Sequence, residues 1–163
     1  MRKIEDGVCY ITRKGEEKLW EKYNSIEEEY VKTTQAMRVS DSMDSDLREN
    51  PEFMELRVKA MYALPKQKKE LYEKLKNVVI IDDMEEYKQF DGKTVIMGSV
   101  VTLDIDGDTE VYTILGTEEG DVENGIINVN AGLAQAIIYH EVGEVIPFNG
   151  MTIKILKVEK AVI

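Results

Sequence analysis

The sequence predicts an α+β protein in which a long antiparallel pair of helices is followed by a sheet domain. Two observations predict this order. Apolar residues recur at alternating steps of four and three across the first half of the chain, as they do along a coiled coil. From Thr94 onward, short segments rich in Val, Ile and Thr replace that pattern, which is typical of strands. We therefore expect a helical domain over residues 1–77 and a second domain over residues 78–163.

The first ten residues are expected to form an irregular or strand-like arm, and the first helix is predicted from about Thr12 to Val39. Thr12 is a candidate cap for this helix. At 1.5 Å per residue, a helix of this span is on the order of 40 Å long. Its apolar seam is predicted to consist of Leu19, Tyr23, Ile26, Tyr30, Thr33 or Thr34, and Met37.

The second helix is predicted to begin at Pro51, because Asn50 is a good N-cap and proline at the first helical position loses no useful N–H. Joined by a short connection, the two helices must pack antiparallel. Pro65 interrupts the second helix at a cost of roughly 3 kcal/mol, so we expect a bend or a local break near Leu64. The matching seam is predicted to consist of Phe53, Leu56, Ala60, Ala63 or Leu64, Gln67, Leu71 and Leu75.

The second domain is predicted to be an antiparallel sheet with one short helix, the helix lying between Leu133 and His140. Asp106-Gly107 is a hairpin signal between two of the expected strands. Residues 82–89 are expected to form a loop or a short turn. The expected strands are Thr94–Met97, Ser99–Ile105, Glu110–Leu115, Ile126–Val129 and Met151–Val158.

Composition excludes several classes of protein. Apolar residues make up 43% of the 163 positions, which is enough for a core and unlike a disordered chain. No stretch reaches the roughly 18 apolar residues of a membrane span, and the first residues contain no apolar signal region. Cys9 and His140 are each the only residue of their type, so one chain cannot form a disulfide framework or a two-histidine metal site. We therefore expect a cytoplasmic protein without a membrane partner.

The net charge of −11 is distributed unevenly. Residues 1–77 carry 16 basic and 16 acidic side chains, which cancel, whereas residues 78–163 carry 5 basic and 16 acidic side chains. A domain this acidic repels phosphate backbones, so it is not expected to bind nucleic acid through its overall charge. A protein partner with a basic or apolar patch fits the second half better, although a role in solubility alone stays open.

A cluster of carboxylates lies between the two predicted helices, in the stretch that includes Asp44, Asp46 and Glu49. This places the acids at the tip of the helical hairpin. Such a tip has two interpretations, a solvated polar turn or a site for a hard cation, because Mg²⁺ binds to one or two carboxylates and keeps several waters.

The stretch Asp46-Leu47-Arg48-Glu49-Asn50-Pro51-Glu52-Phe53 resembles the G-D-L-(K/R)-E-N-A-E-Y tip of the bacterial Gre transcript cleavage factors, the GreA/GreB family. Residues 11–19 resemble the T-x-x-G-x-x-K-L opening of that family, and the spacing between the two motifs fits without a gap. Residues 126–139 are similar to its I-S-x-x-S-P-(I/L)-x-x-A-L-(I/L)-G segment, and residues 153–159 to its F-x-I-x-x-V-x-Y strand. The resemblance covers nearly the whole chain.

The resemblance implies an N-terminal coiled coil over residues 1–77 and, over residues 78–163, a polymerase-docking domain with a fold like that of the FK506-binding prolyl isomerases. It also implies a factor that is not an enzyme by itself. Its coiled coil enters the secondary channel of RNA polymerase and stimulates the polymerase's own Mg²⁺-dependent cleavage of backtracked transcripts. Contact with nascent RNA is then indirect, inside the polymerase active centre.

The resemblance also assigns roles near the tip. Asp46 and Glu49 match the catalytic carboxylates, which share a Mg²⁺ ion with the polymerase, and Asp44 is a further candidate ligand. Two carboxylates do not make a strong Mg²⁺ site, so binding by the isolated protein is expected to be weak or absent. Arg48 and Arg57 match basic positions that are expected to contact RNA or the polymerase.

Some residues depart from the family pattern. Ser45 replaces a glycine, Pro51 an alanine and Ala131-Gly132 a Ser-Pro pair, and Asp41 and Asp44 add acids before the tip. Three hypotheses follow: a stimulator of transcript cleavage, a Gre relative whose acidic tip inhibits polymerase without stimulating cleavage, and a non-catalytic adaptor that keeps the fold. The two matching tip acids favour the first hypothesis, and the surplus acids favour the second.

Overall fold

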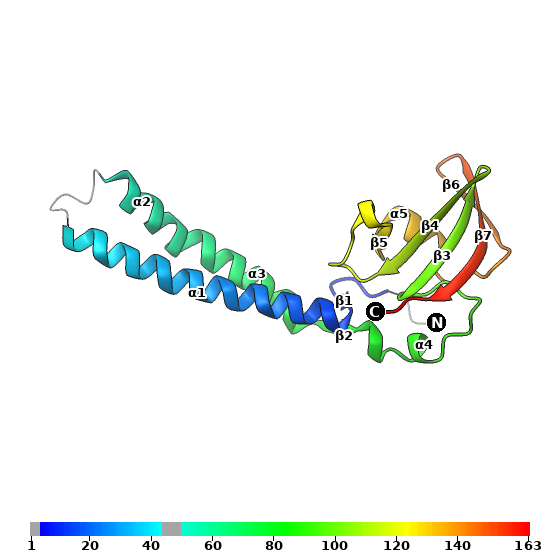
Figure 1. Cartoon of the computed structure of the whole chain (residues 1–163), viewed down its shortest axis with the longest axis horizontal. Coiled ribbons are helices and arrows are strands. Elements are labelled where there is room, and N and C mark those ends of the chain that lie inside the picture. The colour runs from blue at the N-terminus through cyan, green and yellow to red at the C-terminus, as the bar shows by residue number, and fades with distance from the viewer. Residues whose placement is uncertain (1–3, 44–49) are drawn as a thin grey trace. The chain divides into compact units, whose positions relative to one another are not determined.

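The computed structural model describes residues 4–43 and 50–163 and confirms the α+β class (Figure 1). The chain divides into two compact units: Glu17–Lys76 is helical, and Asn77–Ile163 forms a sheet unit together with the described residues up to Glu16. The predicted helical domain, residues 1–77, included the N-terminal arm. In the structure this arm belongs to the sheet unit, because strand β1 (Cys9–Ile11) pairs in parallel with strand β2 (Val78–Ile80).

The helical unit is built from helix α1 (Arg13–Met43), which begins in the sheet unit, and from a return arm. The return arm consists of α2 (Pro51–Val58), a five-residue π-helical turn η1 (Lys59–Ala63) and α3 (Leu64–Lys76). Glu29 pairs with Lys59, and the earlier Glu27 pairs with the later Lys68, so the two arms run antiparallel, as predicted. Ile26 of α1 packs between them with Leu64 and Leu71 of α3.

The π-helical turn lies directly before Pro65. The Leu64 N–H donates to the carbonyl of Lys59, five residues back, where an α-helix would use the residue four back. Pro65 has no N–H to donate, and its ring needs space near the preceding turn, which the wider turn supplies. The irregularity predicted near Leu64 is therefore confirmed, and it takes the form of a widened turn.

At the widened turn the apolar seam of the return arm passes through Leu64, and it continues at the predicted Leu71 and Leu75. Leu64 is only 2% exposed, whereas Ala63 lies on the surface. The prediction of Gln67 in the seam was wrong, since Gln67 is exposed and Lys68 is the half-buried residue at this level. On α1, Thr33 rather than Thr34 is the buried threonine.

The sheet unit contains a five-stranded sheet in the order β5-β4-β3-β7-β6. The predicted Asp106-Gly107 hairpin joins β3 to β4, and both turn residues have positive φ, as such turns require. The sheet is mixed rather than wholly antiparallel, because β5 pairs in parallel with β4 after a connection that brings the chain back. The strands are β3 (Ser99–Ile105), β4 (Asp108–Leu115), β5 (Ile126–Asn128), β6 (Val145–Phe148) and β7 (Met151–Lys160).

Short α-helices and 3₁₀ turns complete this unit. The predicted turn over residues 82–89 is a 3₁₀ turn η2 (Ile81–Asp83) followed by α4 (Glu85–Lys88). A second 3₁₀ turn, η3 (Val122–Asn124), precedes β5, and the predicted short helix is α5 (Gly132–Ile137). Ile137 of α5 packs in the core together with side chains of the sheet such as Leu103 and Ile155.

The predicted strand Thr94–Met97 is wrong. Thr94 forms only an isolated bridge with Glu141, and the next three residues run through the core as an irregular buried segment. The Val95 N–H donates to the carbonyl of His140, and the Tyr139 N–H donates to the carbonyl of Val95. The apolar run reflects burial on all sides rather than membership of the sheet. Within the two described ranges, no helix is long and apolar enough to cross a membrane.

Candidate functional site

Most of the predicted site residues lie in the segment between α1 and α2. Asp44, Asp46, Arg48 and Glu49 are outside the described residues, so the roles expected of them stay predictions. Arg57 is described: it lies in the last turn of α2 and its side chain is exposed. The structure thus shows the two helices that flank the predicted tip, α1 and α2.

The return arm begins at the residue that the sequence predicted. The Asn50 side-chain oxygen Oδ1 accepts hydrogen bonds from the backbone N–H groups of Glu52, at 3.0 Å, and Phe53, at 3.3 Å. Asn50 itself has extended backbone angles, and Pro51 occupies the first helical position. This cap satisfies N–H groups that would otherwise lack partners. Glu49 therefore directly precedes a fixed helix start in the sequence.

Ion pairs join the middle of α1 to η1 and α3 of the return arm. The Lys59 Nζ lies 2.6 Å from Glu29 Oε1, and Lys68 forms a second ion pair, with Glu27. The side-chain hydrogen bond that Lys68 donates to Glu27 is the main cause of the raised pKa of Lys68. Exposed ion pairs of this kind contribute little to stability.

Aromatic side chains join the same arms. The rings of Trp20 and Tyr23 meet edge to face with centroids 5.7 Å apart, and the Tyr23 ring lies 6.5 Å from that of Tyr72 on α3. Trp20 thus packs against Tyr23, although part of its ring remains on the surface. The packed seam, the ion pairs and these ring contacts together join the two antiparallel arms.

The first turn of α1 is held by carboxylates that sequence reasoning missed. Glu119, in the loop after β4, accepts hydrogen bonds from both the backbone N–H and the hydroxyl of Thr12. The Thr12 hydroxyl oxygen in turn accepts from the Gly15 N–H at 3.0 Å, which confirms the predicted cap. The threonine signalled the cap, but no local pattern pointed to a partner so distant along the chain.

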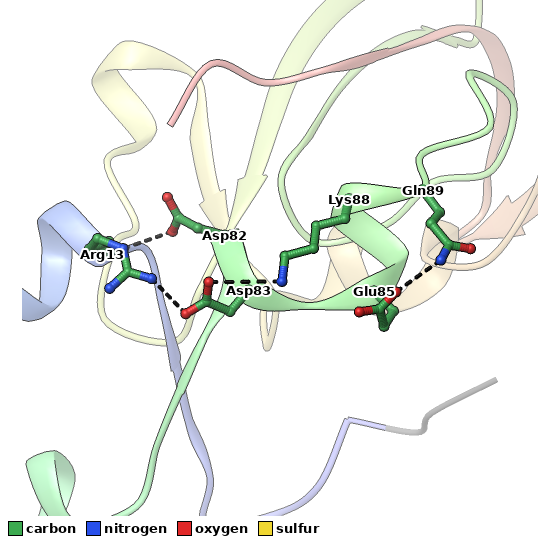
Figure 2. A network of polar contacts seen from close by, with 6 residues as sticks. All are labelled: Arg13, Asp82, Asp83, Glu85, Lys88 and Gln89. Atoms are coloured by element: carbon green, nitrogen blue, oxygen red, sulfur yellow. Dashed lines mark hydrogen bonds and ion pairs between the residues drawn. The ribbon is translucent and has the colours of Figure 1, made fainter.

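A second set of carboxylates binds the next residue, as Figure 2 shows. The Arg13 backbone N–H donates to Asp82 Oδ2 at 2.8 Å, and its guanidinium donates to Asp83 Oδ2 at 2.6 Å. Lys88 of α4 lies 4.0 Å from the other oxygen of Asp83. The Asp82-Asp83 pair therefore links the start of α1 to η2 and α4 within the sheet unit, and its role is structural.

Within residues 4–43 and 50–163, no cluster of three or more His, Cys, Asp or Glu side chains is arranged to hold a metal ion. The predicted tip acids lie outside these ranges.

Comparison with known proteins gives consistent matches. A family model described as "Transcription elongation factor, GreA/GreB, C-term" matches residues 90–160. The transcription elongation factor GreA of Nautilia profundicola is 35% identical over 146 residues, covering 85% of this chain and 84% of that protein. The GreA of Neorickettsia sennetsu is 33% identical over 156 residues, covering 91% of this chain and 94% of that protein.

Solved structures also align with the chain. The crystal structure of GreA factor homolog 1 (Gfh1) of Thermus thermophilus aligns over 93% of this chain and 99% of that chain, with 17% sequence identity and a TM-score of 0.40. A superposition this distant supports no functional conclusion, so the relationship rests on the sequence matches.

Proposed function

Since the chain belongs to the GreA/GreB family of transcription elongation factors, we propose that it binds bacterial RNA polymerase and stimulates the polymerase's own cleavage of backtracked transcripts. In this proposal the helical hairpin enters the secondary channel of the polymerase in the cytoplasm. The chain brings carboxylates to the active centre of its partner and is not an enzyme on its own.

The observation that carries the proposal is the helical hairpin together with the sequence at its turn. The two arms are antiparallel and joined by a packed seam, and the return arm starts at a capped helix end. The sequence between them contains Asp46 and Glu49, which match the acids of the Gre tip motif. An elongated support of this kind suits delivery of a few side chains into a narrow channel.

The tip residues supply oxygen donors. Asp46 and Glu49, with Asp44 as a further candidate, would hold a Mg²⁺ ion jointly with polymerase residues, since hard cations prefer carboxylate and water oxygens. When bound, the ion supplies charge stabilisation for phosphodiester hydrolysis. The carboxylates orient the attacking water or accept its proton. Because the chain contributes only part of the ligand set, the activity requires the polymerase.

The other proposed contacts are made by two basic residues near the tip and by the acidic sheet unit. Arg48 and Arg57 would contact RNA phosphates or polymerase carboxylates near the tip, and the exposed Arg57 side chain is available for this. The sheet unit would dock on the polymerase itself, because its 16 acidic and 5 basic side chains over residues 78–163 disfavour nucleic acid. The nascent RNA is then met only inside the active centre.

A second candidate function rests on the surplus acids. Asp41 and Asp44 extend the acidic stretch before the tip, and extra carboxylates could capture the catalytic metal or repel RNA. A chain acting in this way would inhibit the polymerase without stimulating cleavage.

A transcript-cleavage assay on a stalled elongation complex tests the proposal. Shortening of the transcript that depends on the added chain supports a cleavage factor. Slowed RNA synthesis without shortening supports the inhibitor, and binding to polymerase without either effect supports a non-catalytic adaptor. Absence of any binding to polymerase contradicts all three.

A further inference from the structure

A cavity of about 290 Å³ opens in the sheet unit beside α4. It combines two aromatic rings, two carboxylates and one buried aliphatic side chain, and its lining contains no Lys or Arg. Its volume lies at the lower end of the range for small-ligand pockets, so it suits a single side chain rather than a larger molecule. The lining residues are Glu86, Gln89, Phe90, Asp91, Thr94, Ile96 and Tyr139.

Tyr139 reaches this cavity from a strained backbone. Its φ of 65° lies in the left-handed region, which a bulky side chain occupies only at an energetic cost. The Gre motif that this segment resembles ends in glycine here, the residue best suited to that φ. Two backbone hydrogen bonds hold this segment in place. The Tyr139 N–H donates to the carbonyl of Val95 at 2.7 Å, and the Val95 N–H donates to the carbonyl of His140 at 2.9 Å.

The Asp91 carboxylate of the cavity stays charged at neutral pH. Hydrogen bonds from Thr94 and Lys93 hold the Asp91 carboxylate, chiefly the one from the Thr94 hydroxyl at 2.6 Å, and lower its pKa to about 2. Burial, and secondarily the charge of Glu86, raises the pKa of Tyr139 to about 12, so its ring stays neutral. The cavity therefore presents neutral aromatic rings beside fixed negative charge.

We propose that this cavity receives the guanidinium group of an arginine presented by a partner polypeptide. A guanidinium is planar and weakly hydrated, stacks on aromatic faces such as those of Phe90 and Tyr139, and pairs with a carboxylate such as the half-buried Glu86. A lysine ammonium is a more strongly hydrated point charge and fits this combination less well. The excess of acidic side chains over residues 78–163 attracts a basic polypeptide and repels nucleic acid.

Titration of the full chain with short peptides, followed by two-dimensional NMR of the backbone amides, tests the ligand. The probes are N-acetyl-Gly-Arg-Gly-amide, the same peptide with lysine, and the same peptide with citrulline, which has the shape of arginine without its charge. We expect saturable shifts confined to residues 86–96 and 139–140, tightest for arginine and at least about fivefold weaker for citrulline. Equal binding of the arginine and citrulline peptides would overturn the proposal.

Variants test the site. Glu86→Gln removes the carboxylate, and Tyr139→Gly removes the ring while relieving the backbone, so the variant should fold. Each should weaken arginine binding by about fivefold or more. Glu123→Gln, which removes an equal charge from the exposed turn η3 outside the cavity, should leave binding unchanged. If Glu123→Gln weakens binding as much as Glu86→Gln, general electrostatic attraction explains the effect and the site is wrong. Full binding by a folded Tyr139→Gly variant would contradict the role of the ring.

Discussion

The backbone N–H of Thr12 donates to Glu119 Oε2 at 2.8 Å, although 107 positions separate the two residues along the chain. The same carboxylate also accepts the Thr12 hydroxyl. A negative group at the start of a helix both satisfies a free N–H and interacts favourably with the helix dipole. The first turn of α1 is thus fixed by a side chain of the sheet unit.

Replacing this carboxylate should destabilise the protein. Glu119→Ala removes both hydrogen bonds to Thr12, and we expect a loss of about 1–2 kcal/mol, as for other lost helix caps. Glu119→Gln keeps one acceptor oxygen and should cost less. The midpoint of urea unfolding, followed by circular dichroism, measures the effect, and Glu123→Ala on the exposed turn η3 is the matched control. Equal midpoints for Glu119→Ala and the control would show that the contact contributes nothing.

Gly116 should not tolerate a side chain. A Cβ built on it would lie 1.9 Å from the carbonyl oxygen of Tyr10, a backbone atom in strand β1 that cannot move by itself. Gly116→Ala should therefore cost roughly 3 kcal/mol, the upper end for overpacking. Gly120→Ala is the control, because its nearest neighbour would be the Asn128 side chain at 3.4 Å. Thermal unfolding of both variants separates them, and similar melting temperatures would refute the steric explanation.

The Asp91 carboxyl should titrate at an unusually low pH. Its pKa is about 2, lowered from 3.8 chiefly by the hydrogen bond from the Thr94 hydroxyl. Because the folded-state pKa is depressed, the stabilisation is present above the unfolded-state pKa and is lost as the pH falls from about 4 toward 2. Solvent screening keeps the contribution of this exposed group below about 1 kcal/mol.

Thr94→Val tests that cause. The variant removes the hydroxyl donor and keeps the shape of the side chain, so the pKa of Asp91 should rise toward its ordinary value. Carbon-detected NMR titration of the side-chain carboxyl measures the change. An Asp91 pKa that is the same in wild type and Thr94→Val would show that the backbone N–H groups of Lys93 and Thr94 alone lower it.

Short-range features could be predicted from sequence with good accuracy. The Asn50-Pro51 helix start depends on two adjacent residues, and it lies where the sequence placed it. The Asp106-Gly107 turn is equally local. Pro65 located the irregularity in the return arm but not its form, since a kink and a π-helical turn both accommodate a missing N–H. Leu64 packs in one cluster with Ile26 of the opposite arm, a long-range contact that no local pattern indicates.

Long-range features could not be predicted in the same way. Glu119 caps α1 from a distant loop, and nothing in its neighbours identifies it as a cap. The buried segment Val95–Met97 looks like a strand because burial on all sides selects the same residue types as a central strand does. Strand β6 (Val145–Phe148) was not predicted, since it is short, contains a proline and lies at the sheet edge, where proline is tolerated. The tip roles of Asp46 and Glu49 remain predictions from sequence.

The proposed catalytic role of Asp46 and Glu49 is tested most directly by the rate of transcript cleavage in a stalled elongation complex. The complex is supplied with wild type, Asp46→Asn or Glu49→Gln. The control is Glu55→Gln, which removes an exposed charge from α2. Each tip substitution keeps the size of the side chain but removes a negative oxygen, and a loss of several kcal/mol in the transition state corresponds to two or more decades in rate. We expect that wild type and Glu55→Gln stimulate cleavage, while both tip variants still bind polymerase and lose at least about a hundredfold in rate. Full stimulation by both Asp46→Asn and Glu49→Gln would show that the catalytic assignment is wrong.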